Sequence, residues 1–208
     1  MDRDTAVQRI QDGLGFRSDK SDTIVLRLQE EQRDLEKGKS LPRFLLQEDQ
    51  TLSVTSGSQS LTIPTNFLRR YHSKLRYKAT GETKYTYISW RDYDAAELAY
   101  YDSDPAGPKV VVLRKSEIKV YPEPDNDYTI YWDYYKSDTV LTSNVENTWL
   151  ANAPELLIGG AGLRMAKDLR NKDATALFND MLKAARISVF GDIILEDDDD
   201  EIRLGSNA

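Results

Sequence analysis

Apolar residues recur every three or four positions near both ends of the chain, as they do in amphipathic helices. This spacing predicts helices over residues 4–13, 18–37, 154–170 and 173–189. In the second of these helices, Ile24, Leu28 and Leu35 form the apolar face. The opposite face is predicted to be solvated or to touch a polar partner, and it carries Arg27, Glu30, Glu31 and Asp34. We expect Gly191 to end the last helix.

Between these helices the pattern changes to short runs rich in Thr, Tyr and Val that are separated by turn residues. Strands are predicted at residues 51–55, 60–63, 85–88, 109–113, 117–121 and 128–135, and a short helix or an irregular loop at 90–101. The last three strands are joined by short connections, so we expect an antiparallel meander. Alternation in the last strand places Tyr128, Ile130, Trp132 and Tyr134 on one face and Tyr131 and Tyr135 on the other.

This layout predicts an α+β fold, with a bundle of N- and C-terminal helices, a β-rich insertion and an extended C-terminal arm. Neither pair of helices can bury its apolar stripe alone, so residues 1–40 and 147–190 are expected to form one helical bundle. The insertion covers residues 41–146, and the acidic arm covers residues 191–208.

Charge is distributed unevenly along the 208 residues, whose formal net charge is -7. Seven acidic residues and one basic residue lie from Gly191 onward, so this segment carries -6 and the first 190 residues carry about -1. This nearly neutral charge of the first 190 residues argues against nucleic-acid binding through bulk charge. The chain has no cysteine and one histidine, which excludes disulfides, a thiol nucleophile, a Cys-ligated metal and a two-histidine metal site.

The acidic run near the C-terminus has three interpretations. Adjacent aspartates lack the ligand spacing and the turn glycine of a calcium loop, which argues against a metal site. A solvated, disordered terminus is the plain interpretation. We favour a docking arm, because apolar residues flank the acids on both sides and would fit pockets on a partner with a basic rim. The proposed docking residues are Ile193, Ile194, Leu195, Asp197, Asp198, Asp199, Asp200, Glu201, Ile202 and Leu204.

The aromatic and basic residues of the insertion are further candidates. Tyr131 and Tyr135 are predicted to contact another protein, since tyrosine is favoured in interfaces. Acids among the aromatics argue against a groove for single-stranded nucleic acid. A basic cluster forms a solvated face or receives the acidic arm of a neighbouring copy, and its members are Arg69, Arg70, Lys74, Arg76 and Lys78.

Catalytic chemistry finds no support in the sequence. His72 is interpreted as structural or surface exposed, because no serine elbow accompanies it. Neither a phosphate-binding loop nor a dinucleotide glycine pattern occurs. We therefore expect no catalytic, metal or cofactor site. The chain also has no apolar run long enough for a membrane span and no signal-peptide core, so a soluble intracellular protein is expected.

Six segments between residues 4 and 190 carry a family resemblance through their order and spacing. They are Asp4–Ile10 with Leu14–Phe16, Leu28–Glu36, Leu41-Pro-Arg-Phe-Leu45, Leu61–Arg69, Val120–Lys136 and Asn147–Ile158. Together they resemble the head-to-tail adaptor (connector) proteins of tailed bacteriophages. Arg43 departs from this pattern, because the family usually has tryptophan there. The segment after Gly191 is not covered by these motifs.

The resemblance implies a structural virion protein in the neck between head and tail, made in the cytoplasm of the bacterial host. It implies a ring of twelve copies that binds the portal protein and tail or nozzle proteins. DNA would pass through the channel without specific binding, and the arm would dock on the portal or on the adjacent copy. A tail-completion or tail-terminator protein is the alternative. A tail-associated cell-wall hydrolase is a third hypothesis, but no carboxylate pair stands out for it.

Overall fold

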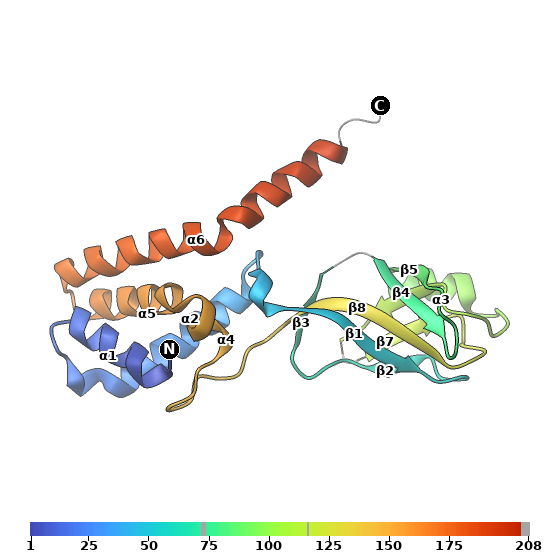
Figure 1. Cartoon of the computed structure of the whole chain (residues 1–208), viewed down its shortest axis with the longest axis horizontal. Coiled ribbons are helices and arrows are strands. Elements are labelled where there is room, and N and C mark those ends of the chain that lie inside the picture. Colours follow the sequence, from blue (N-terminus) through green and yellow to red (C-terminus); the bar gives the residue numbers. More distant parts are fainter. Residues whose placement is uncertain (72–73, 116, 205–208) are drawn as a thin grey trace. The chain divides into compact units, whose positions relative to one another are not determined.

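The computed structural model describes residues 1–71, 74–115 and 117–204, with the backbone alone for Lys74 and for residues 192–204 (Figure 1). The chain divides into two units. The helical unit combines Met1–Leu45 with the chain from Asp138 onward, and the β unit is Leu46–Ser137. The described residues include six α-helices and eight strands, which confirms the α+β class predicted from the sequence.

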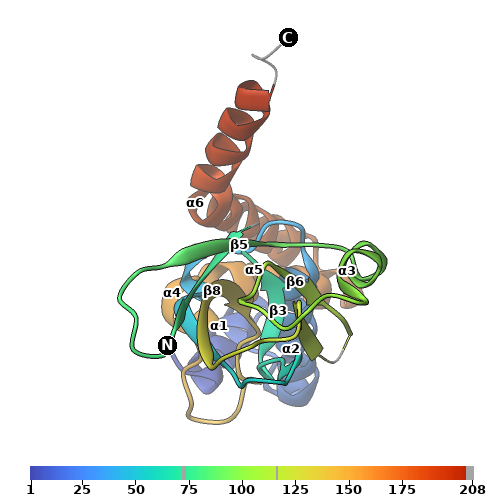
Figure 2. The same cartoon turned by 90° about the vertical axis from the view of Figure 1, so that its right-hand side faces the viewer.

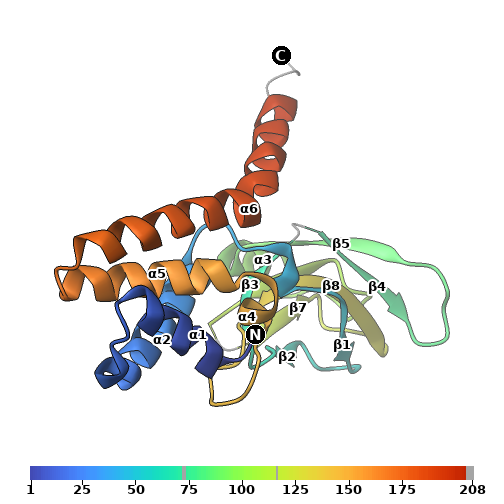
Figure 3. The same cartoon turned by 60° about the vertical axis from the view of Figure 1, so that its left-hand side comes forward.

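The helical unit is organised around α5. Its elements are α1 (Arg3–Gly13), η1 (Ser18–Lys20), α2 (Ser21–Lys37), η2 (Arg43–Leu45), α4 (Thr148–Asn152), α5 (Pro154–Asp168) and α6 (Lys172–Leu204). Helix α5 contacts α1, α2 and α6, and it lies between α6 and the N-terminal helices in Figures 1 and 3. Gly162 allows the close approach of α6, because a Cβ there would overlap the Phe178 ring. The four predicted helices are therefore confirmed, with small shifts in their bounds except at the C-terminal end of α6.

Helix α6 corrects two expectations about the C-terminal segment. Gly191 does not end the helix, and the backbone up to Leu204 is helical rather than extended. A single glycine inside a helix costs only about 1 kcal/mol relative to alanine. A helix that already exists also extends easily, because each added residue contributes a hydrogen bond without a new nucleation step.

The β unit contains one sheet and one helix. Its elements are β1 (Leu46–Val54), β2 (Ser60–Thr62), β3 (Phe67–Arg70), β4 (Lys74–Ala79), β5 (Thr86–Trp90), α3 (Tyr93–Tyr100), β6 (Val110–Leu113), β7 (Glu117–Tyr121) and β8 (Tyr128–Lys136). The strand order is β1-β8-β4-β5-β6-β7-β2, and β3 also pairs with β8. Neighbouring strands are antiparallel except β5 and β6. A parallel pair needs a crossover connection, and α3 lies in that crossover, which settles residues 90–101 in favour of a helix.

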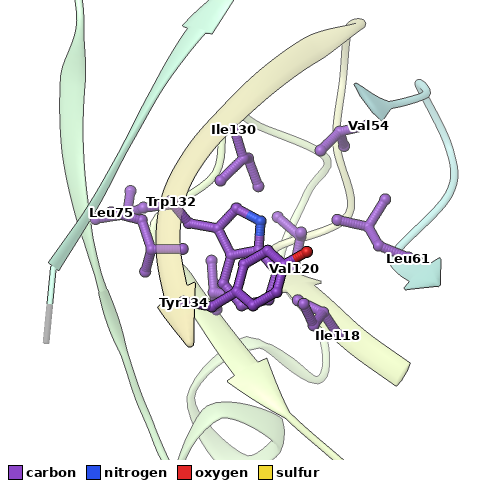
Figure 4. Close-up of a cluster of buried hydrophobic side chains, with 10 residues drawn as sticks. Val54, Leu61, Leu75, Ile118, Val120, Ile130, Trp132 and Tyr134 are labelled. Atoms are coloured by element: carbon purple, nitrogen blue, oxygen red, sulfur yellow. The ribbon is translucent and has the colours of Figure 1, made fainter. Parts of the chain in front are cut away.

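The inward side chains of β7 and β8 meet in a shared core (Figure 4). Ile118 and Val120 of β7 pack in one cluster with Ile130, Trp132 and Tyr134 of β8. The predicted meander of the last three strands is therefore wrong. Strands β6 and β7 do pair, but β8 pairs with β1, β3 and β4 instead. The connection over residues 122–127 lets β8 cross to the far side of the core, where its apolar face is buried against β7.

Candidate interaction surfaces

Strand β8 presents two different faces, as its alternation predicts. Ile130, Trp132 and Tyr134 are buried in the core of the β unit. Tyr131 and Tyr135 point the other way and are half-buried. The structure thus places both candidate tyrosines on the outer face of the sheet, four residues apart on one strand.

Tyr131 belongs to a cluster of aromatic and cationic side chains. Its ring meets the Tyr85 ring edge-on, with centroids 5.3 Å apart. The Arg76 guanidinium lies 4.9 Å from the Tyr85 centroid and 5.8 Å from the Tyr131 centroid. The Lys78 ammonium lies 5.7 Å from both centroids. These distances suit cation–π attraction, which is worth roughly 0.5–1 kcal/mol at exposed sites.

A bulge in β1 brings an acid to this cluster. The β1–β8 register shifts between Gln47 and Gln50, and Asp49 there has a φ of 53°. The Asp133 carboxylate accepts a hydrogen bond of 2.7 Å from the Asp49 backbone N–H. The Asp49 carboxylate forms an ion pair with Arg76. The Arg76 guanidinium is therefore held by the Asp49 carboxylate of the bulge and by the rings of Tyr85 and Tyr131.

We call this region the cation–aromatic face, defined by Arg76, Lys78, Tyr85, Tyr87 and Tyr131. Tyr87 is its most accessible aromatic residue, with 70% of its surface exposed. The face lies on the outer side of β4, β5 and β8, because Leu75 and Ile88 of the same strands point into the core. It combines apolar rings with positive charge, which suits a partner surface that is both apolar and acidic.

Tyr135 lies in a second ring pair at the other end of β8. Its ring is perpendicular to that of Tyr71, with centroids 5.5 Å apart. The Tyr71 backbone N–H donates to the Asp133 carbonyl over 3.1 Å. Nearby, the Arg70 guanidinium lies 5.7 Å from the Trp90 centroid. The two candidate tyrosines therefore contact different aromatic partners.

Several predicted residues are only partly described. His72 lies outside the described residues, and the Lys74 side chain is not described either. The docking residues from Ile193 to Leu204 belong to α6, where the structure describes the backbone but not their side chains. The docking role of this segment therefore stays a prediction.

A buried carboxylate lies between α2 and α5. Glu31 is only 5% exposed, which corrects the solvated interpretation of this position. Its expected polar partner does exist, because the Arg164 guanidinium lies 2.9 Å from the Glu31 carboxylate and 2.8 Å from that of Asp34. Gly160 makes room for the carboxylate, since a Cβ there would overlap it. Burial raises the pKa of Glu31 despite the attraction of Arg164.

A second set of polar contacts, which we call the polar joint, connects α2 to Asn147 and to α4. The Asn147 amide donates 3.1 Å to Gln32 Oε1, and its carbonyl oxygen accepts 2.9 Å from the Leu150 backbone N–H. Glu36 Oε1 accepts from Trp149 Nε1 over 3.1 Å. Sequence reasoning missed this joint. Glu31 and Gln32 follow Ile24 and Leu28 at helical spacing, and polar residues at such positions are the signal that could have revealed it.

A shallow apolar groove lies between the start of α5 and the middle of α6. It has a volume of about 300 Å³ and includes Leu156, Met181 and Ala185 among its lining residues. Farther along the outer side of α6, Leu177 is 50% exposed and Ile187 is 74% exposed. The helical unit thus offers apolar surface of its own to a partner.

Among the residues whose side chains the structure describes, 1–71, 75–115 and 117–191, no group of three or more His, Cys, Asp and Glu side chains could hold a metal ion. In the same part of the chain, no helix is both long and apolar enough to cross a membrane.

The chain matches a model of a known protein family. A family model described as SU10 adaptor protein matches residues 1–204. Curated proteins give no match. The match covers both units and the whole of α6.

Proposed function

Because the chain belongs to the SU10 adaptor protein family, a family of phage head-to-tail adaptors, we propose that it joins the portal to the tail in the neck of the virion. In this role twelve copies form a ring on the portal and extend its channel. DNA passes through the channel without specific binding. The role is structural, with other virion proteins as its partners, and it needs no catalytic site or cofactor.

The extent of the family match carries this proposal. The match includes both units, so the adaptor role concerns the whole chain and not one module grafted onto another protein. The charge distribution adds support. The first 190 residues carry only about -1, which suits a channel wall that DNA must pass without being gripped.

The proposed role divides the chain by function. Helices in the ranges 1–40 and 147–190 form the bundle of the ring. The insertion, residues 41–146, faces the tail, with Tyr131 and Tyr135 on its outer sheet face as contacts. The acidic segment, residues 191–208, docks on the portal or on the next copy, with its aliphatic residues in a groove and its acids facing basic side chains.

Truncation after Phe190 tests the proposal. The shortened protein should fold but co-sediment poorly with purified portal rings, because it lacks the docking segment. The backbone of this segment is already helical up to Leu204, so docking would not have to order that part of it. Unchanged binding by the truncated protein would show that the segment is a dispensable solvated end.

Two full-length variants separate the parts of the docking contact. Replacement of Ile193, Ile194 and Leu195 by serine should abolish most of the binding at any salt concentration. Replacement of the four aspartates 197–200 by asparagine should weaken binding at low salt only, since exposed charge pairs are screened over about 8–10 Å at physiological ionic strength. Failure of the full-length protein to bind the portal at all would reject the adaptor role.

A further inference from the structure

The outer side of α3 exposes large apolar side chains among acids. Leu98 is 88% exposed and Tyr101 is 80% exposed. Asp94 and Asp102 are exposed beside them, and all four line a hollow of about 730 Å³. Residues 91–104 contain five acids and one base, a net charge of -4. We call Asp94, Leu98, Tyr101 and Asp102 the α3 patch.

The other side of α3 is firmly attached to the sheet. Ala96 is fully buried and packs with Val110, Val112 and Tyr121 on the outer face of β6 and β7. The Tyr121 hydroxyl also donates a hydrogen bond to the Glu97 carboxylate. The exposure of Leu98 and Tyr101 therefore belongs to a helix with a defined orientation. An exposed apolar surface on a fixed element is typical of an interaction site.

The cation–aromatic face has the complementary chemistry. On this face Arg76 and Lys78 carry positive charge, and Lys109 lines a hollow together with Tyr87. Asp49 offsets part of this charge through its ion pair with Arg76. Tyr87, Tyr85 and Tyr131 supply apolar rings beside these charges. Both surfaces thus pair exposed apolar groups with charge, and the signs of the charges are opposite.

The two surfaces are fixed on different strands of one sheet, because α3 covers β6 and β7 while the cation–aromatic face lies on β4, β5 and β8. Figure 2 shows α3 on one side of the β unit and the connection from β4 to β5 on the other. One copy therefore cannot bring its own two surfaces face to face. A second copy can, and two different complementary patches generate a head-to-tail contact, which forms a ring where the rotation between copies closes.

We propose that the α3 patch of one copy docks on the β4–β5 side of the cation–aromatic face of the next copy, which leaves Tyr131 on β8 for the tail. Leu98 and Tyr101 pack against Tyr87, while Asp94 and Asp102 face Arg76 and Lys78. Charge steers the approach, and the apolar side chains provide the contact that persists when salt is added. This inference rests on the proposed ring and names the contact between its copies.

Cysteine cross-linking tests the contact directly, because the natural chain has no cysteine. A Leu98→Cys protein and a Tyr87→Cys protein are mixed under mild oxidation, alone and on portal rings. A mixed disulfide dimer is expected, and a chain carrying both substitutions should give a ladder of multimers. The control pairs Leu98→Cys with Val140→Cys, which lies in the helical unit and is 65% exposed. A mixed dimer no more abundant than this control, both alone and on portal rings, would overturn the proposal.

Charge reversal tests the electrostatic part of the same contact. In the cross-linking mixture, Asp94→Lys with Asp102→Lys should lower the dimer yield about tenfold or more, since like charges then face each other. Adding Arg76→Glu and Lys78→Glu to the Tyr87→Cys partner should restore most of the yield. A reversal that leaves the yield unchanged, or a restoration that fails while both proteins stay folded by circular dichroism, contradicts the proposed pairing.

Truncation after Phe190 distinguishes the other possible occupant of the cation–aromatic face. The mixed dimer should form equally well without the acidic segment. Loss of the dimer on truncation would assign the face to that segment and overturn the α3 contact. The adaptor role is judged separately by portal binding. Absence of cross-linking with intact portal binding rejects only the contact between copies, and cross-linking without portal binding rejects only the adaptor role.

Discussion

The helical unit and the β unit differ in what they bury. The buried polar residues that the structure describes all lie in the helical unit, and they are Gln11, Glu31, Gln32 and Asn147. The shared core of the β unit consists of aliphatic and aromatic side chains. Its one buried polar atom without a hydrogen-bond partner in the described structure is Trp132 Nε1.

This difference follows from how each unit is assembled from the chain. The β unit is one continuous segment, and most of its strand pairs form around a buried apolar face. The helical unit must bring the first 45 residues together with the chain after residue 138. The hydrogen bond that Asn147 donates to Gln32 of α2 and the ion pair between Glu31 of α2 and Arg164 of α5 connect those two segments. We infer that the polar contacts fix the alignment of the segments, while apolar burial provides most of the stability.

The largest predicted effect is loss of the apolar contact that joins α5 and α6. Phe178 is 1% exposed and lies against Gly13 and Gly162. Phe178→Ala should destabilise the helical unit by about 3–5 kcal/mol, because the cavity cannot collapse fully between helices. Urea unfolding followed by circular dichroism measures the change.

The neighbouring residue provides a matched control. Leu177 is 50% exposed, so Leu177→Ala should change stability by less than about 0.5 kcal/mol. In Phe178→Ala the helical signal should be lost at a lower urea concentration, while most of the near-ultraviolet signal should be retained, because two of the three tryptophans, Trp90 and Trp132, lie in the β unit. Simultaneous loss of both signals would show that the two units unfold as one.

A smaller effect is expected at the polar joint. Asn147→Ala removes the cap of α4 and leaves Gln32 without one of its partners. The predicted cost is about 1–3 kcal/mol, the usual penalty for an unsatisfied buried polar group. Asn152→Ala is the control, because Asn152 is exposed and donates only to the Thr148 carbonyl of its own helix. Equal effects of the two changes would remove the proposed distinction between buried and exposed amides.

The pH dependence of stability sharpens the comparison at Glu31. Burial raises the pKa of Glu31 in the folded state above its ordinary value of 4.5. The folded protein therefore holds this proton more tightly than the unfolded chain, so the contribution of Glu31 to stability falls as pH rises from about 4.5 through the folded pKa. Glu31→Gln should flatten this fall in urea titrations across that range. An unchanged slope would mean that Glu31 does not titrate differently in the two states.

The smallest effect on stability is predicted for the outer face of β8. Tyr131→Ala should cost about 1 kcal/mol, since it removes one ring pair and weak cation–π contacts. Its effect on attachment of the tail should be larger. Tyr134→Ala, three residues along on the buried face, should do the reverse and lower the melting temperature without a specific effect on attachment. A large fall in melting temperature with attachment intact would make Tyr131 a core residue.

The sequence predicted the positions of the helices and strands better than it predicted which strands pair. Helical and alternating patterns located α1, α2, α5, α6 and most of the strands, because both periods depend on burial of one face. The pairing of β8 with β4 was not predictable from connection lengths, since a six-residue loop permits either a hairpin or a crossing over the core. Tyr131 was found by alternation alone. Its contacts with Tyr85 and Arg76 depend on strand order, and the bulge at Asp49 has no signature in residue spacing.

A cryo-electron map of the virion neck tests the central claim most directly. The adaptor account predicts a ring of this chain between portal and tail, with helices of the helical unit against the portal and the outer face of β8 toward tail proteins. Within the ring, α3 of each copy should lie against β4 and β5 of its neighbour. A neck without this chain, or a ring whose β unit binds the portal while the helices face the tail, would contradict the account.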